Sequence, residues 1–207
     1  RLEQFIGGTV SANDLLAHDI KNIDNFYGVW CILPHHTHEM ARPEEIPSIM
    51  KKNRIFAWEL IPGIGRYMSR SFVLEDWLEV AIDRNIPIYA NTEHGISLEE
   101  LADLLHDFPD LTVILTYANV WPSDRLIRPF AEKYPNVYID LSFSITDGGI
   151  ESFVEQYGAD RLLYGSNFPF SYFGANMLMI KHSNISEKDK RAIAGENMNR
   201  IIEGVLL

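Results

Sequence analysis

The sequence alternates short apolar segments with longer amphipathic ones, about once every 25 residues, and this alternation limits the folds that the chain can adopt. The apolar segments are residues 29–33, 54–61, 86–90, 111–115 and 136–141, and the run that leads into Gly165. Between them, apolar residues recur at helical spacing, as in Leu74, Trp77, Leu78 and Ala81. Alternation of this kind predicts an α/β fold with a parallel sheet and right-handed crossovers. An open doubly wound sheet and a (β/α) barrel both satisfy it.

Helix starts are marked most clearly by polar capping residues. Ser97 and Glu100 form a capping-box pattern before an apolar face, and Ser11 with Asp14 gives a similar pattern for a helix to about residue 22. The tail from residue 186 to about 203 is expected to be helical and amphipathic. No linker or low-complexity run divides the chain, so we predict a single domain over residues 1–207.

Composition excludes several classes of protein. The net charge is −11 and no Lys/Arg cluster occurs, which argues against a nucleic-acid partner and against binding to an anionic membrane. No apolar segment approaches the roughly 20 residues of a membrane-spanning helix. The single cysteine, Cys31, excludes an intrachain disulfide and fits a reducing compartment, so we predict a cytoplasmic protein. The chain starts at Arg1 without an initiator Met, and we expect it to begin inside a longer gene product.

The segment from Asp160 to Pro169 predicts the clearest strand exit. Its short apolar run suits a strand buried on both faces, and Gly165 allows the backbone to turn where that strand stops. Pro169 prevents the ladder of hydrogen bonds from continuing. Asn167 is therefore expected just past the carboxyl end of a buried strand, where α/β folds carry their chemistry.

Polar side chains follow each of the predicted strands. In chain order they are His35, His36 and His38; Glu59; Asn91, Thr92, Glu93 and His94; Thr116, Tyr117 and Asn119; Asp140 and Ser142; and Ser166 and Asn167. Because the carboxyl ends of parallel strands converge on one face, the pattern predicts a small-molecule site there. We take Asn91, His94, Tyr117, Asn119, Ser142 and Asn167 as candidate ligand-binding residues. Glu59 and Asp140 are candidate acids or bases, provided that burial shifts their pKa values.

The histidines at 35, 36 and 38 form the most metal-like cluster by composition. Imidazoles at i and i+2 on an extended segment project to the same side and could share a metal ion. No Cys or Asp lies in register with them, so we favour a solvated loop and assign no metal ligand.

Five segments, in order, resemble motifs of the amidohydrolase superfamily, specifically its amidohydrolase-related hydrolases and decarboxylases. Residues 160–169 resemble the D-R-L-L-F-G-S-D-F-P segment, and residues 85–92 the strand l-P-v-x-i-H-t. Residues 108–117, 136–142 and 195–202 are similar to f-P-d-l-k-v-v-l-a-H, N-v-y-l-d-x-S and the closing G-x-N-a-x-R-l-l helix. The resemblance implies a distorted (β/α)8 TIM barrel, whose N-terminal strand would be missing or lie upstream of Arg1.

The resemblance also implies a metal site that this sequence alters. Family members build it from an N-terminal His-x-His, a His on each of two middle strands and an Asp after the last strand, and they use a divalent metal such as zinc. Asn91, Tyr117 and Asn167 stand at the His, His and Asp positions, and no His-x-His of that kind follows Arg1. We therefore expect no metal cofactor. His94 could replace Asn91 only through a three-residue shift, which on a strand reverses the face of the side chain.

Three functions remain open after this comparison, and a barrel with a purely structural role is the least specific of them. The first is a hydrolase or decarboxylase of a small molecule with a degenerate metal site. The second is a non-catalytic barrel that binds a small molecule or a protein partner. A homodimer is the oligomer that we consider. Tyr172, Phe173, Met177 and Met179 are expected to pack in the core, with a substrate-covering loop as the alternative.

Overall fold

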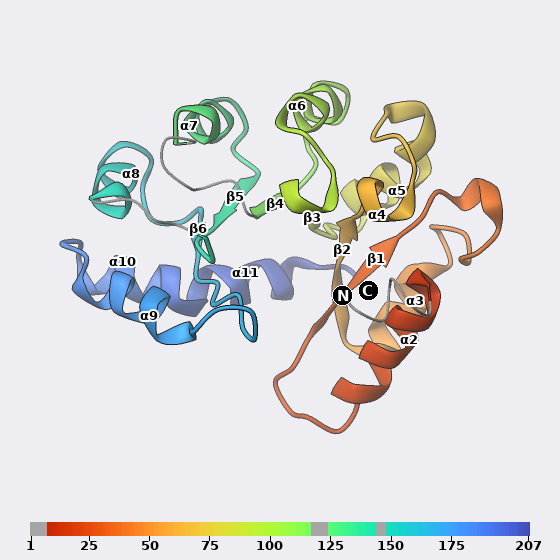
Figure 1. Ribbon diagram of the computed structural model, residues 1–207, viewed down its shortest axis with the longest axis horizontal. Coiled ribbons are helices and arrows are strands. Elements are labelled where there is room, and N and C mark those ends of the chain that lie inside the picture. The colour runs from red at the N-terminus through yellow and green to blue at the C-terminus, as the bar shows by residue number, and fades with distance from the viewer. Residues whose placement is uncertain (1–7, 117–123, 144–147) are drawn as a thin grey trace. The chain divides into compact units, whose positions relative to one another are not determined.

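Short parallel strands, each followed by helical structure, make up the computed structural model (Figure 1). The structure describes residues 8–116, 124–143 and 148–207. The chain forms two compact units. The first runs to Thr112 and includes Val205–Leu207, and the second comprises Val113–Gly204.

The first unit contains three strands and the helices between them. Its elements are α2 (Thr9–Ile20), β1 (Gly28–Ile32), η1 (His35–Thr37), α3 (Ile46–Asn53), β2 (Ile55–Leu60), α4 (Pro62–Gly65), α5 (Ser71–Asp83), β3 (Ile88–Asn91), η2 (Thr92–His94) and α6 (Leu98–Asp107). β1 pairs with β2 and β2 with β3, in both cases parallel.

The second unit repeats the same alternation. Its elements are β4 (Val113–Thr116), α7 (Asp124–Lys133), β5 (Val137–Asp140), α8 (Gly149–Tyr157), β6 (Leu162–Leu163), α9 (Phe173–His182), α10 (Glu187–Arg191), η3 (Ala192–Glu196) and α11 (Asn197–Gly204). β4 pairs with β5 and β5 with β6, again parallel.

The two faces of the β1–β3 sheet differ in chemistry. Trp30 and Trp58 are register partners on one face, and the Trp58 ring meets Trp77 of α5 edge-on, with ring centroids 4.9 Å apart. Both Trp58 and Trp77 are fully buried. Cys31 and Glu59 are the next register pair and face the other way. The helix-covered face is therefore the more apolar one, and the carboxylate of Glu59 lies on the opposite face.

Helix α2 is fixed to β1 through the side chain of Asn13. Its Nδ2 donates to the carbonyl oxygen of Cys31 at 2.8 Å, and its Oδ1 accepts from the amide nitrogen of Cys31 at 3.0 Å. The indole Nε1 of Trp30 donates to the Asn13 carbonyl at 3.0 Å. Because Asn13 is buried, these bonds satisfy polar groups that water does not reach.

A second buried asparagine fixes α11 to β6. Asn197 Nδ2 donates to the carbonyl oxygens of Ala159 and Leu162, both at 2.9 Å. An Arg200 guanidinium nitrogen donates to the Asp160 carbonyl, also at 2.9 Å. Asn197 and Arg200 are the Asn and Arg of the closing helix motif, so their role is to hold this helix against the strand that precedes it.

The strand predictions are confirmed within two residues at each end, and the capping box at Ser97 is confirmed in full. One helix prediction is wrong. Helix α2 begins at Thr9 after Gly8, so Ser11 lies inside its first turn and caps nothing. The tail is helical over the predicted range, as α10, η3 and α11, and Gly195 has non-helical dihedral angles within the π-helical turn η3.

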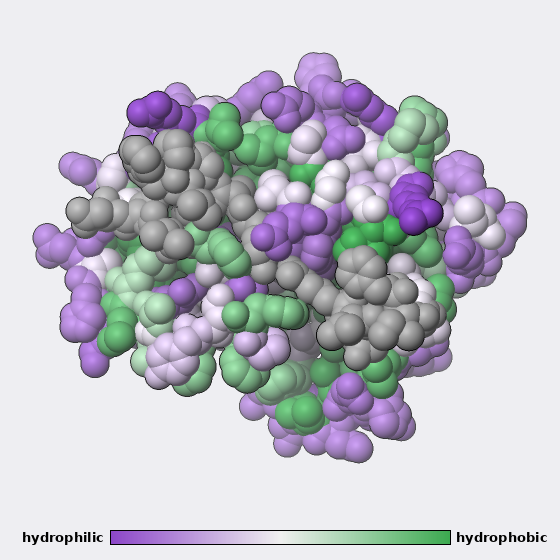
Figure 2. All heavy atoms as spheres, in the orientation of Figure 1, coloured by the Kyte–Doolittle hydropathy of each residue, from purple (hydrophilic) through white to green (hydrophobic). Residues whose placement is uncertain are grey.

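The prediction for the aromatic and Met-rich segment is also wrong. Tyr172 is 75% exposed, and Phe173 and Met177 are exposed as well. Only Gly174 and Ile180 of α9 are buried. The space-filling view shows apolar side chains at the surface over this helix (Figure 2). The segment therefore forms surface rather than core.

Candidate functional site

Five side chains gather at the carboxyl ends of β2 and β3 in the first unit: Cys31, Glu59, Tyr67, Asn91 and His94, called here the Glu59 cluster. Glu59 is the penultimate residue of β2, and Asn91 is the last of β3. Glu59 pairs in register with Tyr89, two residues before Asn91, so Glu59 and Asn91 face the same side of the sheet. Parallel strands thus place them together, as the sequence predicts.

The shortest contact of the cluster joins Glu59 to His94. His94 Nδ1 lies 2.6 Å from Glu59 Oε1, with the two side chains 8% and 19% exposed. Asn91 Nδ2 donates to the same Oε1 at 3.4 Å. A carboxylate bound to Nδ1 fixes the imidazole tautomer and its orientation, and Nε2 is then the nitrogen that exchanges a proton. Among the residues that the structure describes, Nε2 has no hydrogen-bond partner.

The turn after β3 brings His94 to this position. Asn91 Oδ1 accepts from the Glu93 amide at 3.0 Å and so caps the short helix η2, which ends at Gly95. Gly95 has a φ of 98° and packs against the backbone of Gly63, where a Cβ would clash. The expectation that His94 faces away from the Asn91 side is therefore wrong, because the strand ends at Asn91 and a helical turn replaces the two-residue period.

Tyr67 completes the cluster and is not evident from the sequence. Its phenolic oxygen accepts from the Ile61 amide at 2.8 Å. Burial raises the pKa of Tyr67, and the nearby Cys31 and Glu59 raise it further. The phenol therefore stays protonated and can donate a hydrogen bond at neutral pH. Cys31 Sγ lies 3.9 Å from Glu59 Oε2, and the thiol is buried.

A second polar cluster lies at the ends of β5 and β6, inside the second unit. Asp140 Oδ1 accepts from the Ser142 amide at 2.7 Å and from the Ser142 hydroxyl. Burial raises the pKa of Asp140, and the bonds from Ser142 oppose that shift. A Cβ on Gly165 would clash with both side chains, so glycine is required there by close approach.

Asn167 and Asn176 lie on the chain that follows β6, and Asn176 contacts Ser142. Asn167 has a left-handed backbone with φ of 51°, and its Nδ2 donates to Ser171 Oγ at 3.1 Å. Asn176 Nδ2 contacts three carbonyl oxygens, those of Leu141, Ser142 and Gly165, at 3.2, 2.9 and 2.6 Å. Its only signal in the sequence is a polar residue within an apolar helix.

The other predicted residues have different outcomes. Tyr117 and Asn119 lie outside the described residues. His35 and His36 belong to a 3-10 turn rather than an extended segment. The expectation that imidazoles at i and i+2 project to the same side therefore does not apply there. The rings of His35 and His36 stack on each other with centroids 4.3 Å apart, and His35 Nδ1 lies 3.2 Å from Asp76 Oδ2.

The donor chemistry of the described residues does not match a transition-metal centre. The oxygen of Asn91 is engaged by the Glu93 amide and its nitrogen by Glu59, and neither is an imidazole nitrogen. Asn167 offers no carboxylate. In the described part of the chain, no three His, Cys, Asp or Glu side chains are grouped to hold a metal ion. We therefore derive no chemical step through a metal.

Similar structures of known proteins share this fold. A TIM-barrel protein from Bordetella bronchiseptica is 24% identical, with a TM-score of 0.71 over 93% of this chain and 72% of the other. A 2,6-dihydroxybenzoate decarboxylase from Rhizobium is 18% identical, with a TM-score of 0.69 over 94% and 76%. A dihydroxybenzoic acid decarboxylase from a Polaromonas species, with bound manganese and 2-nitroresorcinol, is 17% identical, with a TM-score of 0.67 over 95% and 75%.

The fold class is thus α/β, of the (β/α)8 TIM-barrel type, as predicted. Among curated protein sequences none matches this chain significantly. The family model described as amidohydrolase matches residues 67–202, which is more than half of the chain. The match includes all five sequence motifs, the pair of Asp140 and Ser142, and part of the Glu59 cluster. On this evidence the chain belongs to the amidohydrolase family.

Proposed function

We propose that this protein is a small-molecule decarboxylase of amidohydrolase type, acting on a hydroxylated aromatic carboxylate, with His94 as its proton-transfer group. The observation that carries the proposal is the 2.6 Å contact between His94 Nδ1 and Glu59 Oε1 at the carboxyl ends of neighbouring strands. The substrate class is supported by the decarboxylases of similar fold. Hydrolysis of a small molecule by the same residues is the broader form of the proposal.

In the proposed reaction, His94 and Glu59 supply the proton that replaces the carboxylate on the substrate. With a proton on Nε2, His94 delivers it to the ring carbon that bears the carboxylate. The bond between that carbon and the carboxylate then breaks, carbon dioxide leaves, and the bonding pair restores the aromatic ring. Glu59 stabilises the imidazolium before the transfer, and the imidazole regains its proton from water. Glu59 is a positioning residue in this scheme.

Replacement of His94 tests the proposal. Carbon dioxide release from 2,6-dihydroxybenzoate is measured with the wild type, His94→Gln, Glu59→Gln and Lys188→Gln. A general acid contributes about 10²–10⁴-fold, so His94→Gln is expected to lower kcat by at least about 100-fold. Glu59→Gln is expected to lower kcat less and to shift the pH profile, because the amide retains a hydrogen bond without the charge. Lys188, on the surface of α10, serves as the control.

Unchanged turnover in His94→Gln would contradict this mechanism. The alternative function, a non-catalytic barrel that binds a small molecule, is favoured by the amides of Asn91 and Asn167 at positions where the family resemblance implies ligands. Equilibrium dialysis of 2,6-dihydroxybenzoate with chelator-treated protein separates the two. Binding that survives the chelator in a protein without turnover would support the alternative and refute the decarboxylase.

A further inference from the structure

A pocket of about 600 Å³ lies within the second unit, between α9 and the segment formed by α10 and η3. It is lined by Tyr164, Met177, Ile180, Lys181, Glu187, Lys190, Arg191 and Ala194. Its volume falls within the range of small-molecule sites, roughly 300–1,000 Å³. None of its residues belongs to the Glu59 cluster or to the pair of Asp140 and Ser142.

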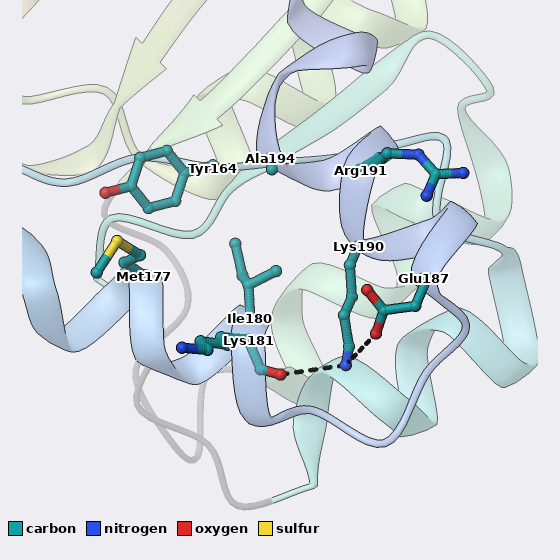
Figure 3. Close-up of a pocket in the computed structure, with 8 residues that line it drawn as sticks. All are labelled: Tyr164, Met177, Ile180, Lys181, Glu187, Lys190, Arg191 and Ala194. Atoms are coloured by element: carbon teal, nitrogen blue, oxygen red, sulfur yellow. Dashed lines mark hydrogen bonds and ion pairs between the residues drawn. The ribbon is translucent and has the colours of Figure 1, made fainter.

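The walls of this pocket are apolar. Figure 3 shows Tyr164 and Met177 on one side, Lys190 and Arg191 on the other, and Ile180 rising from α9 between them. Ala194 of η3 adds a small side chain to the wall. The backbone amide of Tyr164 donates to the Ile193 carbonyl at 2.9 Å, which fixes the wall from β6 against η3. An apolar group of a ligand would therefore meet a preformed surface.

The charges that border the pocket are mostly positive. Lys190 is compensated, because its Nζ lies 2.9 Å from Glu187 Oε1 and 3.1 Å from the Lys181 carbonyl (Figure 3). Arg191 has only a weak, exposed contact of 3.8 Å with Glu196. In the described part of the chain, no carboxylate lies within ion-pair distance of the Lys181 ammonium. Lys181 and Arg191 thus leave two poorly compensated cations in a chain whose net charge is −11.

We propose that this pocket binds an organic anion with an apolar body, such as a medium-chain or aromatic carboxylate. Met177, Ile180 and Tyr164 would contact the body, and Lys181 and Arg191 would pair with the carboxylate. An anion is favoured over a cation because the single carboxylate of the lining, that of Glu187, is already bound by Lys190. This inference does not rest on the proposed function.

Octanoate is the probe for the test. Octylammonium is the control, because it has an apolar chain of the same length and the opposite charge. The full chain is labelled with ¹³C-methyl methionine, and the Met177 signal is assigned with Met177→Leu. Octanoate is expected to shift the Met177 signal saturably. The Met50 signal, from a fully buried side chain of the first unit, is expected to stay in place and so to report an unchanged fold. Octylammonium is expected to cause no saturable shift.

Substitutions then test separately the charged side chains of the pocket and the space that it offers to a ligand. Lys181→Gln/Arg191→Gln is expected to weaken octanoate binding about tenfold, since each partly exposed ion pair contributes a few-fold. Ala194→Trp, which fills the pocket, is expected to abolish the Met177 shift, and Lys188→Gln is expected to bind as the wild type does. The proposal is overturned if octanoate leaves Met177 unmoved, if octylammonium binds equally well, or if the double variant retains full affinity.

Discussion

Asp140 shows how one residue couples the fold to pH. Burial raises the pKa of Asp140 above its ordinary value of 3.8, so the folded state binds this proton more tightly than the unfolded state does. The associated stability is fully present below pH 3.8 and is lost as the pH rises through the higher pKa of the folded state. Above that range the protein holds a buried carboxylate, which accepts hydrogen bonds from the amide and the hydroxyl of Ser142.

Asp140→Asn should therefore stabilise the protein at neutral pH and not in acid. The amide oxygen still accepts the bonds from Ser142, while the buried charge is absent. We expect a Tm about 2–4 °C above that of the wild type at pH 7, the size of shift that about 1 kcal/mol causes in a chain of this length. The difference should vanish below pH 3.8. Thermal melts by circular dichroism at several pH values check this. The exposed Asp83→Asn is the control, and a pH-independent difference for Asp140→Asn would contradict the argument.

At the scale of elements, α9 is a largely exposed helix in which only Gly174 and Ile180 are buried. Asn176 contacts the carbonyl oxygens at the ends of β5 and β6, whereas most large apolar residues of α9 lie at the surface. From the sequence we expect this segment to pack in the core, with a substrate-covering loop as the alternative. The expectation of core packing is wrong because aromatic and Met-rich composition is the same for a core segment and for an apolar surface.

Replacement of Asn176 should therefore loosen α9. Asn176→Ala removes a donor from three carbonyl oxygens and is expected to lower the free energy of unfolding by about 1–3 kcal/mol. Asn176→Asp should be worse, because a carboxylate would face the same three acceptors. Urea denaturation measures both, with Asn199→Ala on the exposed side of α11 as the control. A loss below about 0.5 kcal/mol for both variants would contradict this role, since that is the ordinary range of surface substitutions.

Element-level prediction succeeded where local chemistry decides the structure. The capping box at Ser97 was predicted correctly because all its contacts lie within one turn. The Ser97 side chain accepts from the Glu100 amide, and the Glu100 side chain accepts from the Ser97 amide. The Ser11 pattern failed because Gly8 already starts the helix. His94 was misplaced because alternation of faces holds only inside a strand, and the left-handed turn at Gly95 depends on contact with Gly63, which lies far away in the sequence.

At the scale of the whole molecule, the order of strands and helices followed from periodicity, because buried strands and amphipathic helices have distinct patterns. The barrel, as opposed to an open sheet, came from the motifs and was confirmed by the solved folds. The contacts of Tyr67 and Asn176 depend on tertiary packing, which no local pattern encodes.

The single domain, cytoplasmic location and homodimer stay predictions, as do the lack of a metal cofactor and of a nucleic-acid partner. No helix in the described ranges is long and apolar enough to span a membrane.

The missing metal ligands predict a result for the whole protein. Asn167→Asp alone is not expected to create tight zinc binding, because Asn91 still supplies no imidazole. Zinc titration against a chromophoric chelator, compared with the wild type and with Asn91→His/Asn167→Asp, measures this. Stoichiometric, tight zinc uptake by the single variant would refute the prediction, as would a stoichiometric transition metal in elemental analysis of the purified wild type.

The contact of Asn13 with β1 has a consequence for behaviour in solution. Within the first unit β1 pairs with β2 on one side, and the amide of Asn13 binds both the N–H and the C=O of Cys31 as a neighbouring strand would. Strands that leave such groups open recruit other chains and promote aggregation. The side chain of Asn13 thus occupies the backbone groups of Cys31 with which another chain could otherwise pair, and alanine at this position would leave both groups open.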